Sequence, residues 1–153
     1  MNKTTFLLAT TLLVLSTSMM NPASAKEDLR NAIVLTQDER NLVLEEMRTF
    51  LETVRVITVA LGKDDMAGVV EPARKVGMAS SGEVPAGLRE KLPKQFKMFA
   101  MSTHKAFDLI ALDAQELEDK QHTLEQLGSL MSNCVSCHAI YRLEAENTKG
   151  KSQ

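Results

Sequence analysis

The sequence has no tryptophan, one tyrosine, two cysteines and four prolines among its 153 residues. Two cysteines are too few for a disulfide-rich scaffold, and so few prolines and glycines disfavour an all-β chain, which needs many turns. The 18 basic residues do not outnumber the 20 acidic ones, which removes the usual electrostatic argument for nucleic-acid binding. The whole sequence is 44% hydrophobic and 25% charged, a composition that can build a globular core.

Residues 1–25 differ in kind from the rest of the chain. They carry one charged residue, Lys3, before an apolar run that ends near Leu15, and they close with the small residues Ala-Ser-Ala. This layout predicts a secretory signal peptide that is cleaved after Ala25. The apolar run has only about ten residues, whereas a bilayer span needs ~20, so a retained anchor is disfavoured. We expect one exported domain, residues 26–153, without a membrane span, in a bacterial periplasm.

The remainder of the chain shows helical periodicity and almost no strand alternation. Thr36 is the expected N-cap of the first helix and Gly62 ends it, Pro72 is expected to bend or break the second, and Pro93 opens the third. The four helical segments are predicted at residues 37–61, 64–79, 93–114 and 121–146, with a loop at 80–87. Four apolar stripes joined by short connections predict an all-α antiparallel four-helix bundle.

A C-x-x-C-H motif occupies residues 134–138 of the last predicted helix. This motif is the signature of covalent attachment of a c-type haem. Two thiols three residues apart lie on one side of a helical turn, where they can add to the two vinyl groups on one side of a porphyrin, and a neighbouring histidine can bind the iron. The predicted apolar stripe of this helix contains Leu124, Leu127, Met131, Cys134, His138 and Tyr141. We therefore expect the haem to be held in the core, between helices.

Three other interpretations of the motif are weaker. A thioredoxin-like redox pair belongs near a βαβ unit, which the pattern does not predict. A disulfide between Cys134 and Cys137 would close a tiny loop and leave His138 unexplained. Zinc needs four ligands, and the other histidines, His104 and His122, lie in other segments; we expect these two to face solvent or to be satisfied by local hydrogen bonds. One covalent haem c is the favoured cofactor.

With its signal peptide, four helices and C-x-x-C-H near the C-terminus, the chain resembles the cytochrome c′ family, the class II c-type cytochromes with their Met-ligated low-spin relatives. Residues 134–142 fit the family pattern C-x-x-C-H-x-x-aromatic-Arg. The resemblance implies that Cys134 and Cys137 form the thioethers, that His138 is the proximal iron ligand and that Arg142 lies on the proximal side, within reach of a propionate. An arginine near a helix C-terminus is also favourable through the helix dipole alone.

The residue on the other face of the iron decides between two functions. His138 lies about nine residues before the predicted end of the last helix. If the first and last helices run antiparallel, the position at the same depth along the bundle lies about nine residues into the first helix, near residue 46. Met47 is the closest residue of the apolar stripe. Residues 40–44, Arg-Asn-Leu-Val-Leu, resemble the family's Arg-x-x-x-distal-residue pattern, which indicates Leu44 instead. Met47 as sixth ligand predicts a low-spin electron-transfer protein, whereas Leu44 predicts a five-coordinate haem that binds small gases such as nitric oxide.

The sequence contains no Gly-rich phosphate loop, nucleophile elbow or credible catalytic dyad, so we expect no enzyme activity beyond electron transfer. Electron transfer implies a redox partner protein, which the sequence does not identify. Members of the family that the chain resembles often form homodimers through their first two helices. Leu44 and Leu51 are the residues that would add an apolar seam to such a contact.

Overall fold

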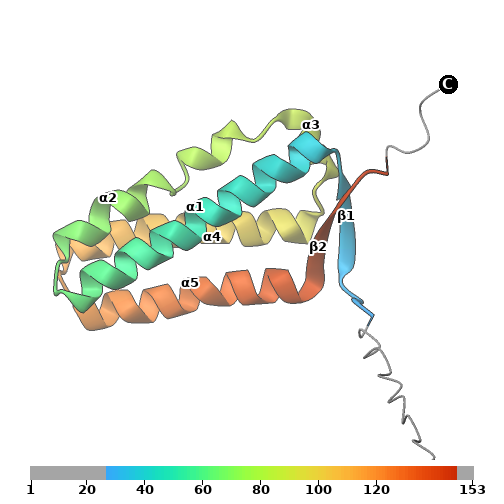
Figure 1. Ribbon diagram of the computed structural model, residues 1–153. Helices are drawn as coiled ribbons and strands as arrows, with labels where there is room; N and C mark the ends of the chain where they lie inside the picture. Colours follow the sequence, from blue (N-terminus) through green and yellow to red (C-terminus); the bar gives the residue numbers. More distant parts are fainter. Residues whose placement is uncertain (1–26, 148–153) are drawn as a thin grey trace, which may run out of the picture.

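The computed structural model describes residues 27–147, which are mostly helical with one small two-stranded sheet (Figure 1). In chain order the elements are β1 (Asn31–Leu35), α1 (Gln37–Gly62), α2 (Ala67–Lys75), the 3-10 helix η1 (Ser80–Glu83), α3 (Ala86–Lys91), α4 (Lys94–Glu116), α5 (Lys120–Ile140) and β2 (Tyr141–Ala145). None of the helices in this part of the chain combines the length and apolar character needed to cross a membrane. The predicted signal peptide lies outside the described residues.

Helix α1 begins and ends where the sequence predicted. The Thr36 hydroxyl accepts a hydrogen bond from the backbone N–H of Glu39, and the Glu39 carboxylate accepts one from the backbone N–H of Thr36. This capping box satisfies two donors that the start of a helix leaves without intrahelical partners. The helix runs to Gly62, as expected, and its buried residues include Val43, Phe50, Ile57 and Leu61.

The middle of the chain is less regular than predicted. Helix α2 is shorter than the expected segment 64–79, and it continues through Pro72, so the predicted break does not occur. The expected loop at 80–87 holds η1 and the first residues of α3. Helix α4 begins directly after Pro93, as predicted, and extends two residues beyond the expected end.

The prediction of almost no strand structure is wrong near both ends of the described chain. Strands β1 and β2 pair in parallel, with Asn31 opposite Tyr141 and Leu35 opposite Ala145. Helix α5 therefore ends at Ile140 rather than near residue 146, and Arg142 lies on a strand instead of in the last turn of a helix. Buried and exposed residues alternate along the second half of β1, as expected of a strand with one side on a core.

The helices pack in the spatial order α1, α2, α4, α5, an arrangement compatible with a helical bundle. One core cluster lies among these helices and is centred on residues such as Ile57, Val69, Phe107 and Leu130. A second cluster lies at the sheet end and consists of Ile33, Leu35, Val43, Leu88, Leu92, Phe96 and Cys137. The last of these residues places the C-x-x-C-H motif at the second cluster.

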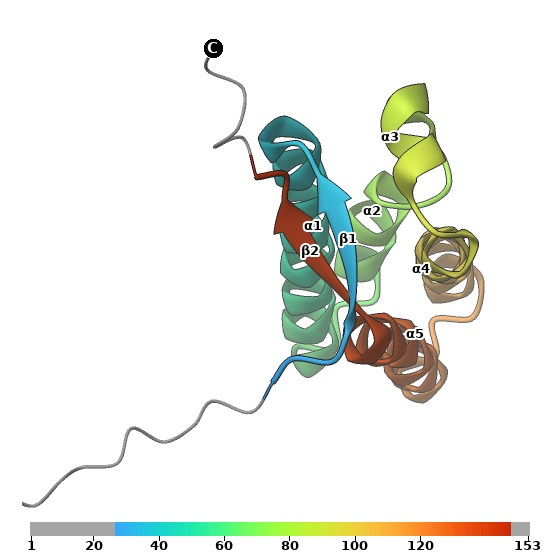
Figure 2. The ribbon, with the colours of Figure 1, turned by 90° about the vertical axis from the view of Figure 1, so that its right-hand side faces the viewer.

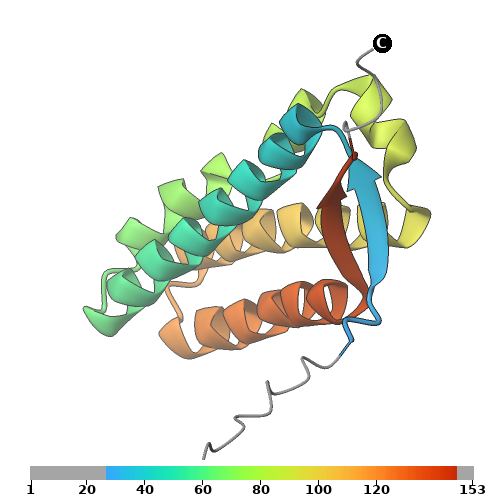
Figure 3. The ribbon, with the colours of Figure 1, turned by 45° about the vertical axis from the view of Figure 1, so that its right-hand side comes forward.

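The sheet sets the separation between the start of α1 and the end of α5. Tyr141 directly follows α5 and pairs with Asn31, the first residue of β1. Thr36 directly precedes α1 and comes immediately after the last residue of β1. Five strand residues at ~3.3 Å each therefore put roughly 15 Å between the two helix ends. Figure 3 shows the consequence: α1 and α5 approach each other far from the sheet and diverge toward it.

Candidate functional site

The C-x-x-C-H motif occupies the last two turns of α5, next to the sheet. Cys134 is half-buried and packs against the first core cluster, and Cys137 is buried in the second. Both are free thiols. Burial raises the pKa of Cys134, and burial together with the charge of Cys134 raises the pKa of Cys137. Both thiols are therefore protonated at neutral pH, unlike the low-pKa thiolate of a redox-active C-x-x-C pair.

His138 is exposed, so the prediction that it lies on the buried seam of the helix is wrong. The buried side of α5 is instead formed by Thr123, Leu127, Leu130 and Cys137, while Leu124 and Met131 are exposed. The predicted period is correct, but the buried stripe is rotated by about one residue around the helix. Within residues 27–147 no hydrogen bond engages the imidazole of His138, which leaves its ring nitrogens available to a ligand.

Four exposed side chains form what we call the outer face of α5: Leu124, Met131, Val135 and His138. Their spacing of seven, four and three residues keeps them on one side of the helix. That side turns away from α4, because Gln126 and Asn133 on the opposite side line a groove with Leu109 of α4. Val135 is 69% exposed, so apolar surface on this side of α5 is open to solvent.

Helix α1 has a matching apolar side. Glu45, Arg48 and Glu52 line a groove with α2, so that side of α1 is polar. The side turned away from α2 carries apolar residues at intervals of three, four and three: Leu44, Met47, Leu51 and Val54. Leu51 is 71% exposed and the other three are half-buried. Both helices thus carry exposed or half-buried apolar side chains, and Figure 3 shows that α1 and α5 diverge toward the sheet.

The structure brings one of the two candidate distal residues together with the motif. Met47 packs against the second core cluster, which contains Cys137. Leu44 is half-buried and, among the described residues, is part of neither cluster. The depth comparison used to predict Met47 assumed a helix that continues to residue 146, which is wrong. The packing of Met47 against the cluster that contains Cys137, and not the depth of His138, is therefore what supports Met47.

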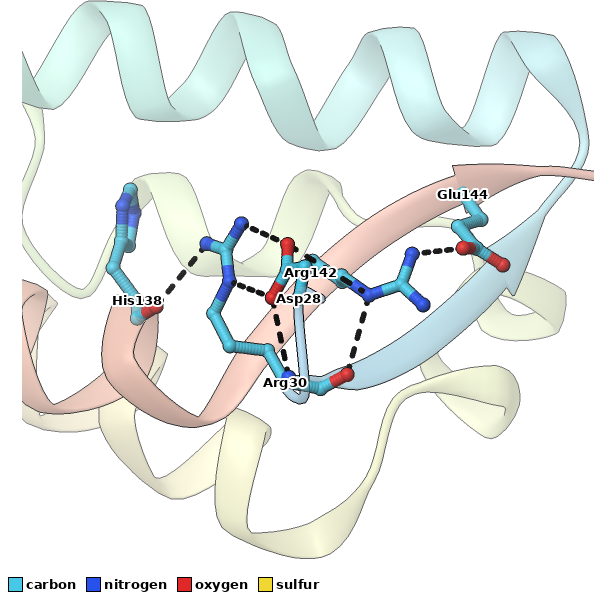
Figure 4. Close-up of polar contacts among 5 residues, drawn as sticks. All are labelled: Asp28, Arg30, His138, Arg142 and Glu144. Carbon is cyan, nitrogen blue, oxygen red and sulfur yellow. Dashed lines mark hydrogen bonds and ion pairs between the residues drawn. The ribbon is translucent and has the colours of Figure 1, made fainter. Parts of the chain in front are cut away.

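Arg142 lies beside the motif as part of a polar network that joins β2 and the residues directly before β1 to α5 (Figure 4). Its Nε donates to the main-chain oxygen of Arg30 at 3.2 Å, and its guanidinium pairs with Glu144. Arg30 in turn donates from Nη1 to the main-chain oxygen of His138 at 3.2 Å and makes a two-pronged ion pair with Asp28, at 2.9 and 2.7 Å. The Arg30 guanidinium lowers the pKa of Asp28 to about 2.

Sequence reasoning missed Asp28 and Arg30. Nothing local marks them as neighbours of His138, because the contact is made across 108 positions of the chain. It depends on the parallel pairing of β1 with β2. The alternation of β1, with Ile33 and Leu35 buried, is the signal that could have indicated a strand near the predicted cleavage site.

His104 is 2% exposed, so the expectation that it faces solvent is wrong. It is held by non-local contacts: Nδ1 lies 2.9 Å from the Val76 oxygen and 3.4 Å from Ser80 Oγ, and Nε2 lies 3.5 Å from Glu46 Oε1. Its ring packs edge-on against Phe50. Burial acts to lower the pKa of His104, but the Glu46 carboxylate and the Val76 carbonyl outweigh it and raise that pKa above its ordinary value.

His122 is also engaged, with Nε2 3.0 Å from Asp113 Oδ2. No three histidine, cysteine, aspartate or glutamate side chains of the described chain group together as metal ligands.

Comparisons with family models, curated proteins and solved structures return no match for this chain. The functional argument consequently rests on the motif and its surroundings. The donor set fits a covalent haem: two protonated thiols one helical turn apart, an uncommitted imidazole beside them and apolar side chains on both flanking helices.

Proposed function

We propose that this chain is a periplasmic c-type haem protein that resembles cytochromes c′ and transfers electrons. In this proposal α1, α2, α4 and α5 form an antiparallel four-helix bundle, and one haem c is bonded to Cys134 and Cys137 with its iron held by His138. The observation that carries the proposal is the C-x-x-C-H motif at the edge of an apolar face that folding leaves uncovered. An apolar group bound there removes that face from water, which is favourable.

Each part of the site has a distinct task. Cys134 and Cys137 fix one edge of the porphyrin to α5, and the His138 imidazole supplies the proximal nitrogen. Apolar side chains on both helices would exclude water from the faces of the group: Met131 and Val135 on α5, and Leu51 and Val54 on α1. Arg142 supplies a cation at the rim for a propionate. The bound haem supplies reversible one-electron chemistry at iron.

Met47 is the sixth ligand in this proposal, because it packs in the same cluster as Cys137. A thioether is a soft, neutral ligand that raises the reduction potential. The second candidate function is a five-coordinate haem that binds a small gas such as nitric oxide, with Leu44 on the open face. It is favoured by the position of Leu44, which lies half-buried on the same side of α1 as Met47.

The first experiment tests covalent attachment. The full chain is exported in a bacterial host with haem-maturation machinery, and the purified protein is measured by intact mass and by absorbance after denaturation. We expect the mass of the polypeptide plus one haem, and loss of that haem in the variant with both Cys134→Ala and Cys137→Ala. Ser136→Ala, between the two cysteines, is the matched control and should retain it. A bare polypeptide mass with both thiols alkylatable would refute the proposal.

The second experiment separates the two functions. Met47→Ala and Leu44→Ala remove half-buried side chains from the same side of α1. If Met47 binds iron, the native protein is low-spin and unaffected by carbon monoxide, Met47→Ala becomes high-spin and binds carbon monoxide, and Leu44→Ala stays as the native protein. Rapid carbon monoxide binding by the native protein, unchanged by Met47→Ala, would establish the gas-binding function instead.

A further inference from the structure

The outer side of α4 carries a second exposed apolar stripe, opposite the core. Its four apolar members are between 40 and 59% exposed: Met98, Met101, Leu109 and Leu112. Lys94, Lys105 and Glu116 are exposed and continue the same stripe. The core side of the helix is formed by different residues, Phe96, Thr103, Phe107, Ile110 and Ala114 among them. Figure 2 shows α4 end-on at the edge of the domain, with no other described element packed on its outer side.

The order of residues along this stripe is symmetric. From Lys94 to Glu116 the intervals are 4, 3, 4, 4, 3 and 4 residues, with Lys105 at the centre. When two copies of α4 lie antiparallel about a twofold axis at Lys105, each stripe residue meets the residue at the mirrored position. Met98 then lies opposite Leu112 of the second copy, and Met101 opposite Leu109. Apolar therefore meets apolar at the four positions between the charged ends and the central Lys105, which is the self-complementarity that a twofold interface requires.

The charges at the two ends match as well. Lys94 lies opposite Glu116 of the second copy, and the same pair recurs at the other end of the contact. The two ends are 22 residues apart, or ~33 Å along a helix, which is several times the ~8–10 Å screening length, so each pair acts independently. Lys105 meets its own copy at the centre, an unfavourable contact that its long side chain relieves by placing its stem on the apolar stripe and its ammonium in water.

We propose that the outer side of α4 is a symmetric interface through which two copies of this chain associate. The occupant is a second copy because the stripe is complementary to itself: apolar residues meet apolar residues at four positions, and Lys94 meets Glu116 at both ends. Docking of an unrelated partner does not require this property. The contact uses neither of the first two helices, and it is independent of whether a haem is bound to α5.

The first test measures self-association of the full chain by sedimentation equilibrium at protein concentrations up to about 1 mM. Association that begins only above about 1 mM does not require a specific interface. We expect a monomer–dimer equilibrium that Leu109→Lys shifts to monomer. Leu42→Lys is the matched control, because Leu42 on α1 is 52% exposed and Leu109 is 54% exposed; it should leave the dimer intact. Far-ultraviolet circular dichroism checks that both variants fold. A native chain that stays monomeric, or a dimer lost in Leu42→Lys but not in Leu109→Lys, overturns the proposal.

The second test uses charge reversal. Lys94→Glu and Glu116→Lys each place like charges at both ends of the contact, and each should raise the dimer dissociation constant on the order of tenfold. The variant with both changes restores opposite charges and should return to the native constant. Lys105→Leu removes the central repulsion and should tighten the dimer, whereas loss of this lysine would weaken docking to an acidic partner protein. Failure of the double variant to recover contradicts the antiparallel arrangement.

Discussion

The guanidinium of Arg30 donates a hydrogen bond to the main-chain oxygen of His138, 108 positions further along the chain (Figure 4). The last carbonyl groups of a helix have no intrahelical donors, and a cation at this end also complements the helix dipole. Arg30 therefore caps α5 from the other end of the described chain, with Asp28 holding its guanidinium in place. Asp28 and Arg30, which directly precede the strand between α5 and α1, thus secure the turn that carries the C-x-x-C-H motif.

Removal of this contact should weaken the sheet end of the domain. We expect Arg30→Ala to lower the urea midpoint of unfolding and to speed amide hydrogen exchange in the last turn of α5, because the His138 carbonyl and the Asp28 carboxylate both lose their partner. Arg55→Ala is the matched control, since Arg55 also pairs with a nearby acid, Glu52, but on an exposed helix surface. Equal midpoints in the two variants would show that Arg30 is an ordinary surface ion pair.

The capping box of α1 gives a second prediction. Thr36→Ala removes the hydroxyl that accepts the Glu39 N–H, and it should lower the free energy of unfolding by about 1 kcal/mol. Thr58→Ala is the control on the same helix, because the Thr58 hydroxyl only donates to the Val54 carbonyl on the exposed surface; alanine there should be neutral or slightly stabilising. Chemical denaturation of both variants measures the difference, and a larger loss for Thr58→Ala would contradict the capping role.

The His104–Glu46 contact predicts a pH dependence. The pKa of His104 is raised in the folded chain, so its contribution to stability is fully present below the unfolded value near 6.5 and is lost as the pH rises through the folded value. We expect the stability difference between the native chain and Glu46→Gln to grow from pH 8.5 toward pH 5.5. Nuclear magnetic resonance should show a lower His104 pKa in that variant.

Glu45→Gln is the control for this dependence, because Glu45 is exposed and pairs with Arg48 on the surface. Its unfolding free energy should run parallel to that of the native chain across the same pH range. If the curves for Glu46→Gln and Glu45→Gln coincide, the contact between Glu46 and His104 does not contribute to folding.

Local signals predicted the starts of α1 and α4. Thr36 and Pro93 mark helix starts through chemistry that acts within one turn, and the structure confirms both. The end of α5 was missed because strand β2 is stabilised by pairing with residues 31–35, which is a non-local contact. Tyr141 lies three residues after His138 and continues the helical spacing, so periodicity up to that residue did not indicate the change to a strand.

The position of His138 shows a different limit of sequence reasoning. Two stripes on α5 have nearly the same period, one through Leu124, Met131 and His138 and one through Thr123, Leu130 and Cys137. Both are largely apolar, and the structure buries the second. A helix that has one buried and one exposed apolar side carries two apolar stripes. Composition alone cannot tell which of the two is buried. Tertiary packing against α4 decides which is buried.

The burial of the two thiols gives a last prediction for the chain made without haem. Cys137 is buried and Cys134 is half-buried, and burial raises the pKa of both. Because the thiolate is the reactive form, iodoacetamide should label both slowly at pH 7, with Cys134 ahead of Cys137, and the two rates should converge in denaturant. Mass spectrometry of the labelled peptides measures each rate. Fast labelling of Cys134 at neutral pH would instead indicate a lowered pKa, the property of a redox-active C-x-x-C pair, and would revive that interpretation of the motif.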